Sequence, residues 1–552
     1  MIKLTADFET TTDPNDCRVW AWAVCHIYDT NRIEIGNTIE SFIEYLFQGE
    51  TKKVYFHNLK FDGNFIISWL ENNGFMHSTA KNPPCEKTYT TLIADNGLFY
   101  NMTVLYNNVY VEFLDSLKLL PFSVAQIARG FDLPISKLEI NYEEYREPGH
   151  MLTPLEENYI KHDVLIMALA LRIMFQNGLT KLTIGGNAIA ELREVIGKKH
   201  FDYLFPRDVD DASIRKAYRG GFTYLKPEYA DKDVGEGLVL DVNSLYPSVM
   251  KNRPYPFGKG VFFKGKYKNN PRFPLFVQAF SCVFELKPGH IPTIQLKNNY
   301  YFGATEYLTS SKGVECELCL TSVDLKIFLE HYNVKCLTYH CGYMFPAIHD
   351  VFSPFIEKWT AEKIKAKEEG NKAKYTIAKL IQNSSYGKFG TRPDVRNMQP
   401  YLDEEGVVRF RFLERSEKQT LYIPVGVFVT AWARDVTIRS AQRLYDRFIY
   451  SDTDSLHILR KEIPEGIEIS DTALGAWKIE NTFDRARFIR AKTYIEETNG
   501  KLNVTACGMP ANCHDQVTWE NFHPGAIYTG KLMPKYVRGG IVLQKSDFTI
   551  RI

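Results

Sequence analysis

The chain has no excess of charge of either sign, since 67 Lys and Arg oppose 66 Asp and Glu and give a formal net charge of +1 over 552 residues. Because a whole-chain sum hides local patches, this balance neither indicates nor excludes a polyanionic partner. The chain also lacks internal repeats and low-complexity tracts, which excludes a repeat protein. Its longest apolar run, 164–171, is too short to span a bilayer, and an acid at position 7 precedes any apolar stretch. We therefore expect neither a membrane span nor a secretory signal.

The ten cysteines form no dense framework, which is typical of a protein from a reducing compartment. One group stands apart, because Cys316 and Cys319 are followed by Cys336 and Cys341. Four thiols at such spacings are a possible zinc site, so a structural zinc ion is one alternative for this segment.

The length exceeds that of a single hydrophobic core and predicts at least two domains. Glycines 185 and 186, within 182–187, predict a hinge between a first half, 1–185, and a second half, 186–552. Patterns of apolar residues predict the elements of the first half, namely strands over 2–8 and 53–56 and a long helix over 155–175. In the second half they predict strands over 237–241, near Tyr422 and Phe448, through much of 256–350 and over 528–552, and helices over 351–369 and 372–389.

Three acids of the second half are candidates for a metal site. Asp241 ends the apolar run 238–240 and begins the motif DVNSLYPS, so a carboxylate stands where a buried strand turns. The segment RFIYSDTDSLHIL predicts a β-hairpin with Asp452 and Asp454 at its tip. Taken alone, SDTD is also an ordinary polar turn, because Asp and Ser are common turn formers.

A basic helical pair lies between these acids. Its window, 361–392, holds eight Lys and Arg against three Glu. Lys379, Asn383 and Tyr386 recur at i, i+4 and i+7 and share one helix face, and Lys372 falls on that face one heptad earlier. A run of charge is often only a solvated face, but lysines interleaved with Tyr and Asn also suit a triphosphate and a stacked base.

A second set of acids lies in the first half. Asp7 and Glu9 alternate with apolar residues and emerge on one face of the first strand, where two carboxylates repel unless a cation lies between them. Asp62 follows the second strand, and Tyr159 and Asp163 share a helix face at i, i+4. An exposed edge strand and helix caps are the structural alternatives. Four acids suffice to hold two divalent ions about 3.5 to 4 Å apart for phosphodiester hydrolysis.

In order along the chain, DVNSLYPS, K-x-x-x-N-S-x-Y-G and Y-x-D-T-D-S resemble the three polymerase motifs of family B DNA polymerases. Tyr218-Arg-Gly-Gly221 before them and Lys492-Thr-Tyr494 after them are similar to marks of the protein-primed members, of the phi-twenty-nine-like bacteriophage type. The first-half acids resemble the three exonuclease motifs of proofreading polymerases. The resemblance extends over nearly the whole chain.

The resemblance implies an α/β multidomain fold, in which an RNase H-like 3′–5′ exonuclease domain (1–185) precedes a right-hand polymerase domain (186–552) with two insertions. The implied parts are a palm at about 186–252 and 423–508, a first insertion at about 253–355, fingers at about 356–390, a second insertion at about 391–422 and a thumb at about 509–552. The first insertion would bind a priming terminal protein, and the second would encircle the template and give strand displacement and processivity.

The resemblance also implies site residues. In polymerisation, Asp241 and Asp454 would ligate two Mg²⁺ ions, for which Mn²⁺ can substitute, with Asp452 as a supporting carboxylate. The implied nucleotide contacts are Tyr246, which excludes a ribose 2′-hydroxyl, and Lys367, Lys379, Asn383 and Tyr386. The implied primer and template contacts are Lys492, Tyr494, Tyr218, Gly220, Gly221, Thr430 and Arg434. In proofreading, two ions would be held by Asp7, Glu9, Asp62 and Asp163, with Tyr159 orienting water. The implied contacts to the primer end are Thr10, Tyr55, His57, Asn58, Phe61, Phe65, Ser116, Leu117 and Lys137.

By the same resemblance we expect a soluble viral enzyme in the cytoplasm of an infected bacterium, working as a monomer or as a heterodimer with terminal protein. Its other partners would be DNA template, primer and dNTPs, with no membrane. The rival interpretations are a binding scaffold with decayed acids and a stand-alone nuclease with an accessory domain. A phosphate-binding loop at Gly260 to Lys266 is rejected, because Tyr267 stands where Ser or Thr must hold Mg²⁺.

Overall fold

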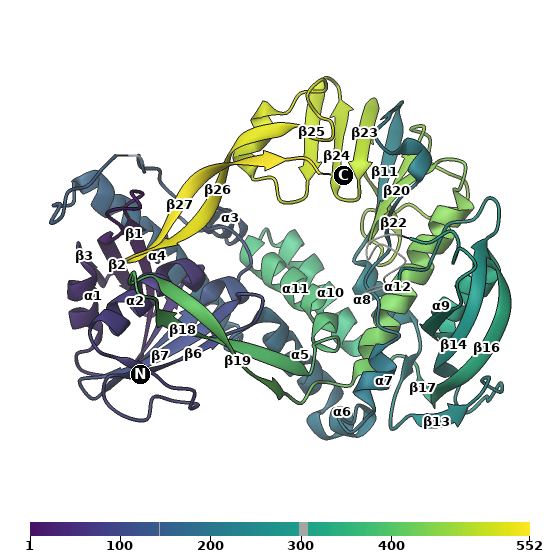
Figure 1. Cartoon of the computed structure of the whole chain (residues 1–552), viewed down its shortest axis with the longest axis horizontal. Helices are drawn as coiled ribbons and strands as arrows, with labels where there is room; N and C mark the ends of the chain where they lie inside the picture. The colour runs from purple at the N-terminus through teal and green to yellow at the C-terminus, as the bar shows by residue number, and fades with distance from the viewer. Residues whose placement is uncertain (143, 297–306, 552) are drawn as a thin grey trace.

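The computed structural model describes residues 1–142, 144–296 and 307–551. Part of the predicted first insertion, 297–306, and Ile552 of the predicted last strand lie outside these residues. Figure 1 shows an open arrangement in which the first half lies at one end, two helices of the second half lie near the centre, and long hairpins reach back toward the first half. Within the described residues no helix combines the length and the apolar character needed to cross a membrane.

The first half is built on one eight-stranded sheet of order β3-β2-β1-β4-β8-β7-β6-β5. Its strands are β1 (Ile2–Thr10), β2 (Val19–His26), β3 (Ile33–Gly36), β4 (Lys52–Phe56), β5 (Met76–His77), β6 (Thr88–Ile93), β7 (Phe99–Tyr106) and β8 (Val109–Asp115). Its helices are α1 (Ile39–Leu46), α2 (Leu59–Asn72), α3 (Val124–Gly130) and α4 (Pro154–Gln176). Strand β1 lies inside the sheet, between β2 and β4, so the alternative of an exposed edge strand is wrong.

The helix predicted over 155–175 is confirmed as α4. It begins with a capping box, in which Thr153 accepts a hydrogen bond from the amide of Glu156 and the Glu156 side chain accepts one in return. Buried apolar residues pack α4 against β1 and β2. This packing brings the helix across the face of the sheet on which the first-strand acids emerge.

The predicted hinge at 182–187 is wrong for most of its length. Thr183 caps helix α5 (Ile184–Ile196), and both glycines lie in the first turn of that helix. An added Cβ at Gly185 would approach the Lys388 side chain to 2.9 Å, so close packing rather than flexibility accounts for this glycine.

The second half centres on a five-stranded sheet of order β22-β11-β21-β20-β9, with a second sheet of order β10-β23-β24-β25 beside it. The strands of the first are β9 (Thr223–Leu225), β11 (Gly237–Val242), β20 (Phe448–Asp452), β21 (Ser455–Leu459) and β22 (Trp477–Phe483). Those of the second are β10 (Asp233–Val234), β23 (Arg485–Arg490), β24 (Thr493–Thr498) and β25 (Lys501–Ala506). The surrounding helices are α6 (Lys198–Leu204), α7 (Asp211–Arg215), α8 (Leu245–Asn252), α10 (Ser353–Glu368), α11 (Lys372–Ser384) and α12 (Ile423–Arg443).

The strand predicted near Tyr422 is wrong, because Tyr422 precedes α12, whose first turn contains Pro424. Its β-branched and aromatic residues are typical of a strand, yet nearly all of this helix is buried. A helix buried on all sides has no polar face, and its periodicity is therefore hard to detect. The strand near Phe448 is confirmed as β20.

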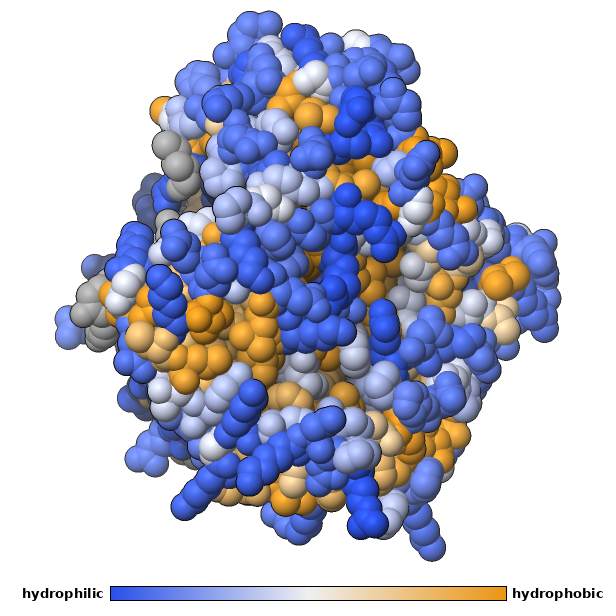
Figure 2. Space-filling model, turned by 90° about the vertical axis from the view of Figure 1, so that its right-hand side faces the viewer, coloured by the Kyte–Doolittle hydropathy of each residue, from blue (hydrophilic) through white to orange (hydrophobic). Residues whose placement is uncertain are grey.

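The region 256–350 is strand-rich, as predicted. Its elements are β12 (Tyr255–Pro256), β13 (Val261–Lys264), β14 (Leu275–Leu286), β15 (Cys316–Thr321), α9 (Ser322–His331), β16 (Tyr332–Phe345) and β17 (Ala347–Ile348). At this end of the molecule apolar side chains reach the surface in separate patches divided by hydrophilic ones (Figure 2).

Two long hairpins connect the halves. The first is β18–β19 (Asp394–Leu402, Val408–Glu417), in which Asn397 forms a β-bridge with Ala94 of the first half. The second is β26–β27 (Ile527–Val537, Gly540–Thr549), which confirms the strands predicted for the tail. The two hairpins meet through a bridge between Val407 and Arg538. At the tip of the second, Gly539 has φ +95° and an added Cβ would lie 2.1 Å from the Cys17 carbonyl oxygen, so only glycine fits there. Both hairpins therefore pack against the first half, through β18 on β6 and β27 on α2 (Figure 1).

Candidate active sites

The sheet register brings the three second-half acids together. Ser455 pairs with Asp241 on one side and with Asp452 on the other, so β11 and β20 flank the start of β21. Asp454 lies in the turn between β20 and β21, where Thr453 has φ +64° and the Val242 amide donates to the Asp454 carbonyl at 2.8 Å. The predicted hairpin is confirmed, and the strand-end position of Asp241 is confirmed with it.

The three carboxylates have different neighbours. Burial, followed by the charge of Asp241, raises the pKa of Asp454 to about 6. Asp241 is paired with Lys478 at 3.1 Å. Asp452 accepts two hydrogen bonds of 2.7 Å from Lys492 and one of 3.1 Å from Thr223. The negative charges of Asp241 and Asp452 both act on Asp454, and a bound cation would relieve this repulsion.

These acids line a cavity of about 850 Å³ that also receives side chains from α8, α10, α11 and β24. The predicted nucleotide and primer residues that line it are Tyr246, Lys367, Lys379, Asn383, Tyr386, Lys492 and Tyr494. Lys372 is not among them, because its ammonium pairs with Asp132 of the first half at 2.7 Å. Lys372 begins α11, one heptad before Lys379, and does not line the cavity.

Two aromatic rings that line this cavity stack on each other. Tyr246 of α8 and Tyr386, just beyond α11, are stacked with centroids 4.0 Å apart and planes inclined by 13°. Rings at this separation are in van der Waals contact. A nucleotide base that stacks on the inner face of Tyr386 must therefore displace the Tyr246 ring.

Four charged residues of the cavity were missed from the sequence, namely Lys363, Asp471, Lys478 and Glu480. Burial lowers the pKa of Lys363, and the charges of Lys379 and Lys478 lower it further, so the cationic side chains lie close together. Lys363 precedes Lys367 by one helical turn, and that spacing was the available signal. Lys478 and Glu480 had no such signal, because strand pairing alone brings β22 to the site.

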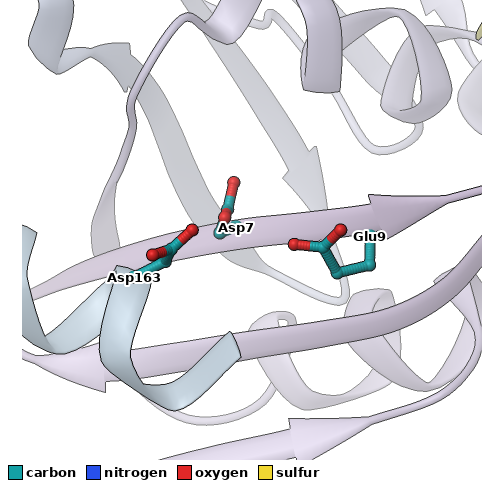
Figure 3. A group of neighbouring side chains, drawn as sticks. All are labelled: Asp7, Glu9 and Asp163. Carbon is teal, nitrogen blue, oxygen red and sulfur yellow. The ribbon is translucent and has the colours of Figure 1, made fainter. Parts of the chain in front are cut away.

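The first-half acids also converge. Ligand atoms of Asp7, Glu9 and Asp163 all lie within 4.8 Å of one another (Figure 3). Asp62 of α2 is buried nearby, and its charge contributes to the raised pKa of Glu9. Buried oxygens of Asp62 and Asp163 have no hydrogen-bond partner. Unpaired buried carboxylate oxygens fit a divalent cation that prefers oxygen ligands.

The electrostatics of this acid cluster support the same interpretation. Burial, then the charge of Asp163, raises the pKa of Asp7 to about 7. Burial, followed by the charge of Asp7, also raises the pKa of Glu9 and of Asp62 well above their usual range. Lys137 pairs with Asp163 and so compensates part of the negative charge of this cluster. Such a cluster retains protons unless further positive charge is bound.

Tyr159 is buried on α4 beside this cluster, and its hydroxyl hydrogen bonds with that of Tyr142. Tyr142 was missed from the sequence, because the loop that carries it has no periodic pattern. The loop is held by Arg146, which donates to the Asn141 carbonyl at 2.7 Å and pairs with the buried Glu156 at 2.9 Å. The structure therefore places Tyr159 and Lys137 at the acids, as expected.

The residues expected to grip a primer end are exposed to different degrees. Asn58, at the start of α2 with φ +81°, is exposed, and Thr10, Tyr55, His57, Phe61, Leu117 and Lys137 are half-buried. Phe65 and Ser116 are each only 1% exposed. His57 is bonded to Ser116 at 3.0 Å and to the Phe122 carbonyl at 2.7 Å. Buried Ser116 and Phe65 can shape the surface but have little area for direct contact.

The loop 218–222 packs directly behind the second-half acids. An added Cβ at Gly221 would lie 2.7 Å from the Thr453 side chain, so glycine permits close approach. Arg434 is 3% exposed, donates to the Arg219 and Gly220 carbonyls at 2.8 and 2.7 Å, and pairs with Asp324 of α9. The predicted template residues Arg434 and Thr430 are thus buried in protein contacts, while Tyr218, Gly220 and Gly221 form the loop itself.

The four cysteines of the possible zinc site are not gathered. Cys316 and Cys319 lie on β15, whereas Cys336 and Cys341 lie on β16, and β14 separates the two strands. Cys316 is buried, and in the register of the sheet it lies opposite Cys282 of the neighbouring strand β14. Among the described residues, Asp7, Glu9 and Asp163 are the one group of three or more His, Cys, Asp or Glu side chains whose ligand atoms all lie within 4.8 Å of one another, and no cysteine belongs to it. The zinc alternative has no support there.

Comparison with known proteins gives consistent matches. A family model described as "DNA polymerase type B, organellar and viral" matches residues 43–156 and 140–473. The DNA polymerase of Bacillus phage B103 is 42% identical, covering 99% of each chain, and that of Streptococcus phage Cp-1 is 31% identical, covering 99% of this chain and 98% of its own. A solved structure, "Phi29 DNA polymerase complexed with primer-template DNA and incoming nucleotide substrates", matches over 100% of both chains at 41% identity with a TM-score of 0.95. This likeness confirms the predicted α/β multidomain fold class, an exonuclease domain followed by a polymerase domain.

Proposed function

The chain belongs to the organellar and viral type B DNA polymerases and is a DNA polymerase of the phi29 type, and we propose that it also proofreads with a 3′–5′ exonuclease and initiates replication on a terminal protein. The observation that carries the first proposal is the presence of two separate carboxylate clusters, each with raised carboxyl pKa values. Divalent cations are general cofactors of this family. Mg²⁺, replaceable by Mn²⁺, with two ions in each site, is our specific proposal.

In polymerisation, Asp241 and Asp454 are proposed to hold the ions, which when bound activate the primer 3′-hydroxyl and neutralise the triphosphate. The protein supplies position and charge, as phosphoryl transfer requires. Lys363, Lys367 and Lys379 face the same cavity and are suited to bind triphosphate oxygens. Asp452, which accepts hydrogen bonds from Lys492, is proposed as a supporting carboxylate of this site.

The other cavity residues are proposed to select and align the substrates. Tyr246 crowds the sugar and excludes a 2′-hydroxyl, while Tyr386 and Asn383 contact the nascent base pair. Lys492 and Tyr494 hold the primer strand beside Asp452. The loop that contains Tyr218, Gly220 and Gly221 supports the template, with Arg434 and Thr430 as buried positioning residues for that loop.

In proofreading, Asp7, Glu9, Asp62 and Asp163 are proposed to hold two ions, with Tyr159 aligning the attacking water. The unpaired oxygens of Asp62 and Asp163 support this role. A pocket misfit is worth only about 1–3 kcal/mol, so selection at the insertion step needs a hydrolytic check. The proposed contacts to the frayed end are Thr10, Tyr55, His57, Asn58, Phe61, Phe65, Ser116, Leu117 and Lys137.

We keep the expected division into an exonuclease domain, 1–185, and a polymerase domain, 186–552, as a proposal, with the same palm, insertion, finger and thumb ranges. By its likeness to a polymerase solved with primer-template DNA and nucleotides, the chain is proposed to bind template, primer and dNTPs. The relatives are bacteriophage proteins, and the proposed place of action is the cytoplasm of an infected bacterium.

Initiation on a terminal protein is proposed from the first insertion. It presents an edge strand, β13, on which Val261 and Phe262 are 40% and 49% exposed. Exposed apolar residues on an unpaired edge suit a protein partner. Hairpin β18–β19, which joins both the first half and hairpin β26–β27, is proposed to encircle the template and to give strand displacement and processivity.

Two assays test these proposals. In a primer-extension gel, the wild type should shorten the primer without dNTPs and extend it with them, Asp454→Asn should only shorten it, and Asp62→Ala should only extend it. Loss of shortening in Asp454→Asn, or its persistence in Asp62→Ala, would contradict the two-site assignment. Incubation with labelled dATP and candidate terminal proteins should yield a covalent protein-nucleotide adduct. Its absence with every candidate would favour ordinary primers.

A further inference from the structure

Lys478 lies directly opposite Asp241 in the pairing of β22 with β11. Side chains at directly opposed positions start about 4.5 to 5.5 Å apart, so the register of the sheet brings these two groups together. The Lys478 ammonium is 3.1 Å from a carboxylate oxygen of Asp241, and its side chain is 36% exposed. The register of β22 against β11 therefore favours this ion pair.

The charges around Lys478 are of both signs. Asp241 is its ion-pair partner, and Asp454 and Glu480 line the same cavity. Lys363, Lys367 and Lys379 also line this cavity, so Lys478 shares one space with both the carboxylates and the lysines. A triphosphate bound with divalent ions at the proposed site would contact both groups.

We propose that Lys478 is an exchanging counter-ion, which holds Asp241 while no divalent ion is bound and moves onto the triphosphate when an ion takes its place. The proposal rests on the proposed role of Asp241 and Asp454 as metal ligands. An ammonium beside a carboxylate that binds a divalent ion is repelled by that ion. The four-carbon stem of lysine allows its charge to move by several ångströms without a backbone shift.

This exchange predicts opposite effects on two ligands. Removal of the ammonium frees Asp241 and should strengthen metal binding in the absence of nucleotide, by roughly two- to fivefold as expected for a partly exposed ion pair. It also removes one charged phosphate contact and should raise the KM for dNTP by about tenfold. A variant that only disturbs the fold weakens both ligands.

The test uses the full chain with Asp7→Ala and Glu9→Ala, so that the first-half acids do not bind the probe. Mn²⁺ binding is measured by electron paramagnetic resonance without nucleotide, and the KM for dNTP and the KM for primer-template are measured separately. Lys478→Met is compared with Lys478→Arg, which keeps the charge. Lys461→Met is the matched control, since Lys461 is 38% exposed and pairs with Asp484 at 2.5 Å in the same half of the chain.

Lys478→Met should bind Mn²⁺ more tightly, show the raised KM for dNTP and keep the KM for primer-template. Lys478→Arg and Lys461→Met should resemble the parent chain. Unchanged or weaker Mn²⁺ binding in Lys478→Met, or an unchanged KM for dNTP, would overturn the proposal. Mn²⁺ binding that survives Asp241→Asn at full stoichiometry would instead overturn the metal-ligand assignment on which the proposal rests, and the two failures are therefore distinguishable.

Discussion

Replacement of Asp7 by Asn should stabilise the metal-free chain at alkaline pH. The pKa of Asp7 rises from 3.8 to about 7 on folding, through burial and the charge of Asp163. Between about pH 4 and pH 7 the unfolded chain therefore loses a proton that the folded chain keeps. The free energy of unfolding falls as the pH rises through that window, and the destabilisation is complete above about pH 7.

The size of the effect follows from the shift. About 3 pH units correspond to roughly 4 kcal/mol, which is an upper bound because the side chain is partly exposed and shares protons with its neighbouring acids. We expect about 2 kcal/mol from Asp7→Asn at pH 8. For a domain of this size, that shifts the first unfolding transition upward by about 5 °C.

Scanning calorimetry in EDTA at pH 8 and pH 4 measures the difference between the variant and the wild type. The advantage of Asp7→Asn should be present at pH 8 and nearly absent at pH 4, where both folded chains are neutral at this position. Added Mg²⁺ should raise the transition of the wild type more than that of the variant. A variant no more stable than the wild type at pH 8 in EDTA would refute the electrostatic reasoning.

Three further predictions concern activity, and one concerns stability. Tyr246→Val should increase the use of ribonucleotides relative to dNTPs by roughly 10- to 100-fold in steady-state incorporation assays, since it removes the proposed crowding. Tyr159→Phe should slow primer shortening by roughly 100-fold while primer extension, measured on the same preparation, is unchanged. Polymerisation should decline as the pH falls through about 6, where protons compete with metal for Asp454, and higher Mg²⁺ should restore part of the rate at pH 5.5. Arg434→Met should cost roughly 3–5 kcal/mol in urea unfolding because it leaves Asp324 buried and unpaired, and the double variant Arg434→Met with Asp324→Leu should recover most of this loss.

The sequence was sufficient to predict where the acids lie in the local structure, because each of them belongs to a short motif with its own geometry. A strand end at Asp241, a hairpin tip at Asp454 and an alternating strand at Asp7 can all be identified within ten residues of sequence. The secondary structure around the acids could also be predicted from nearby residues, as the confirmed helix α4 shows. Failures came where tertiary packing decided, since α12 is buried over most of its length, polar residues included, and Gly185 lies against the Lys388 side chain.

Two neighbours of the acid clusters, Lys478 and Tyr142, were harder to predict than the acids. Lys478 reaches its acid through strand pairing and Tyr142 reaches its site through a loop anchored by Arg146, and neither contact has a sequence period. The sequence also gave no sign that Arg434 is buried. Its residue type is typical of a nucleic-acid contact, yet its side chain lies inside the protein. Such contacts depend on elements distant in the chain.

Both acid clusters draw their partners from separate parts of the fold. Asp7 lies on β1 and Asp163 on α4, while the pairing cation, Lys137, comes from a loop between them. Each carboxylate loses water only when the complete fold excludes it, and each raised pKa measures the cost of that exclusion. Divalent ions bound at the proposed sites would offset this cost in the folded chain and would find no such cluster in the unfolded one. The affinity of each site for metal and the stability of the surrounding structure are therefore coupled, so a change that weakens metal binding by relieving acid repulsion should stabilise the metal-free chain.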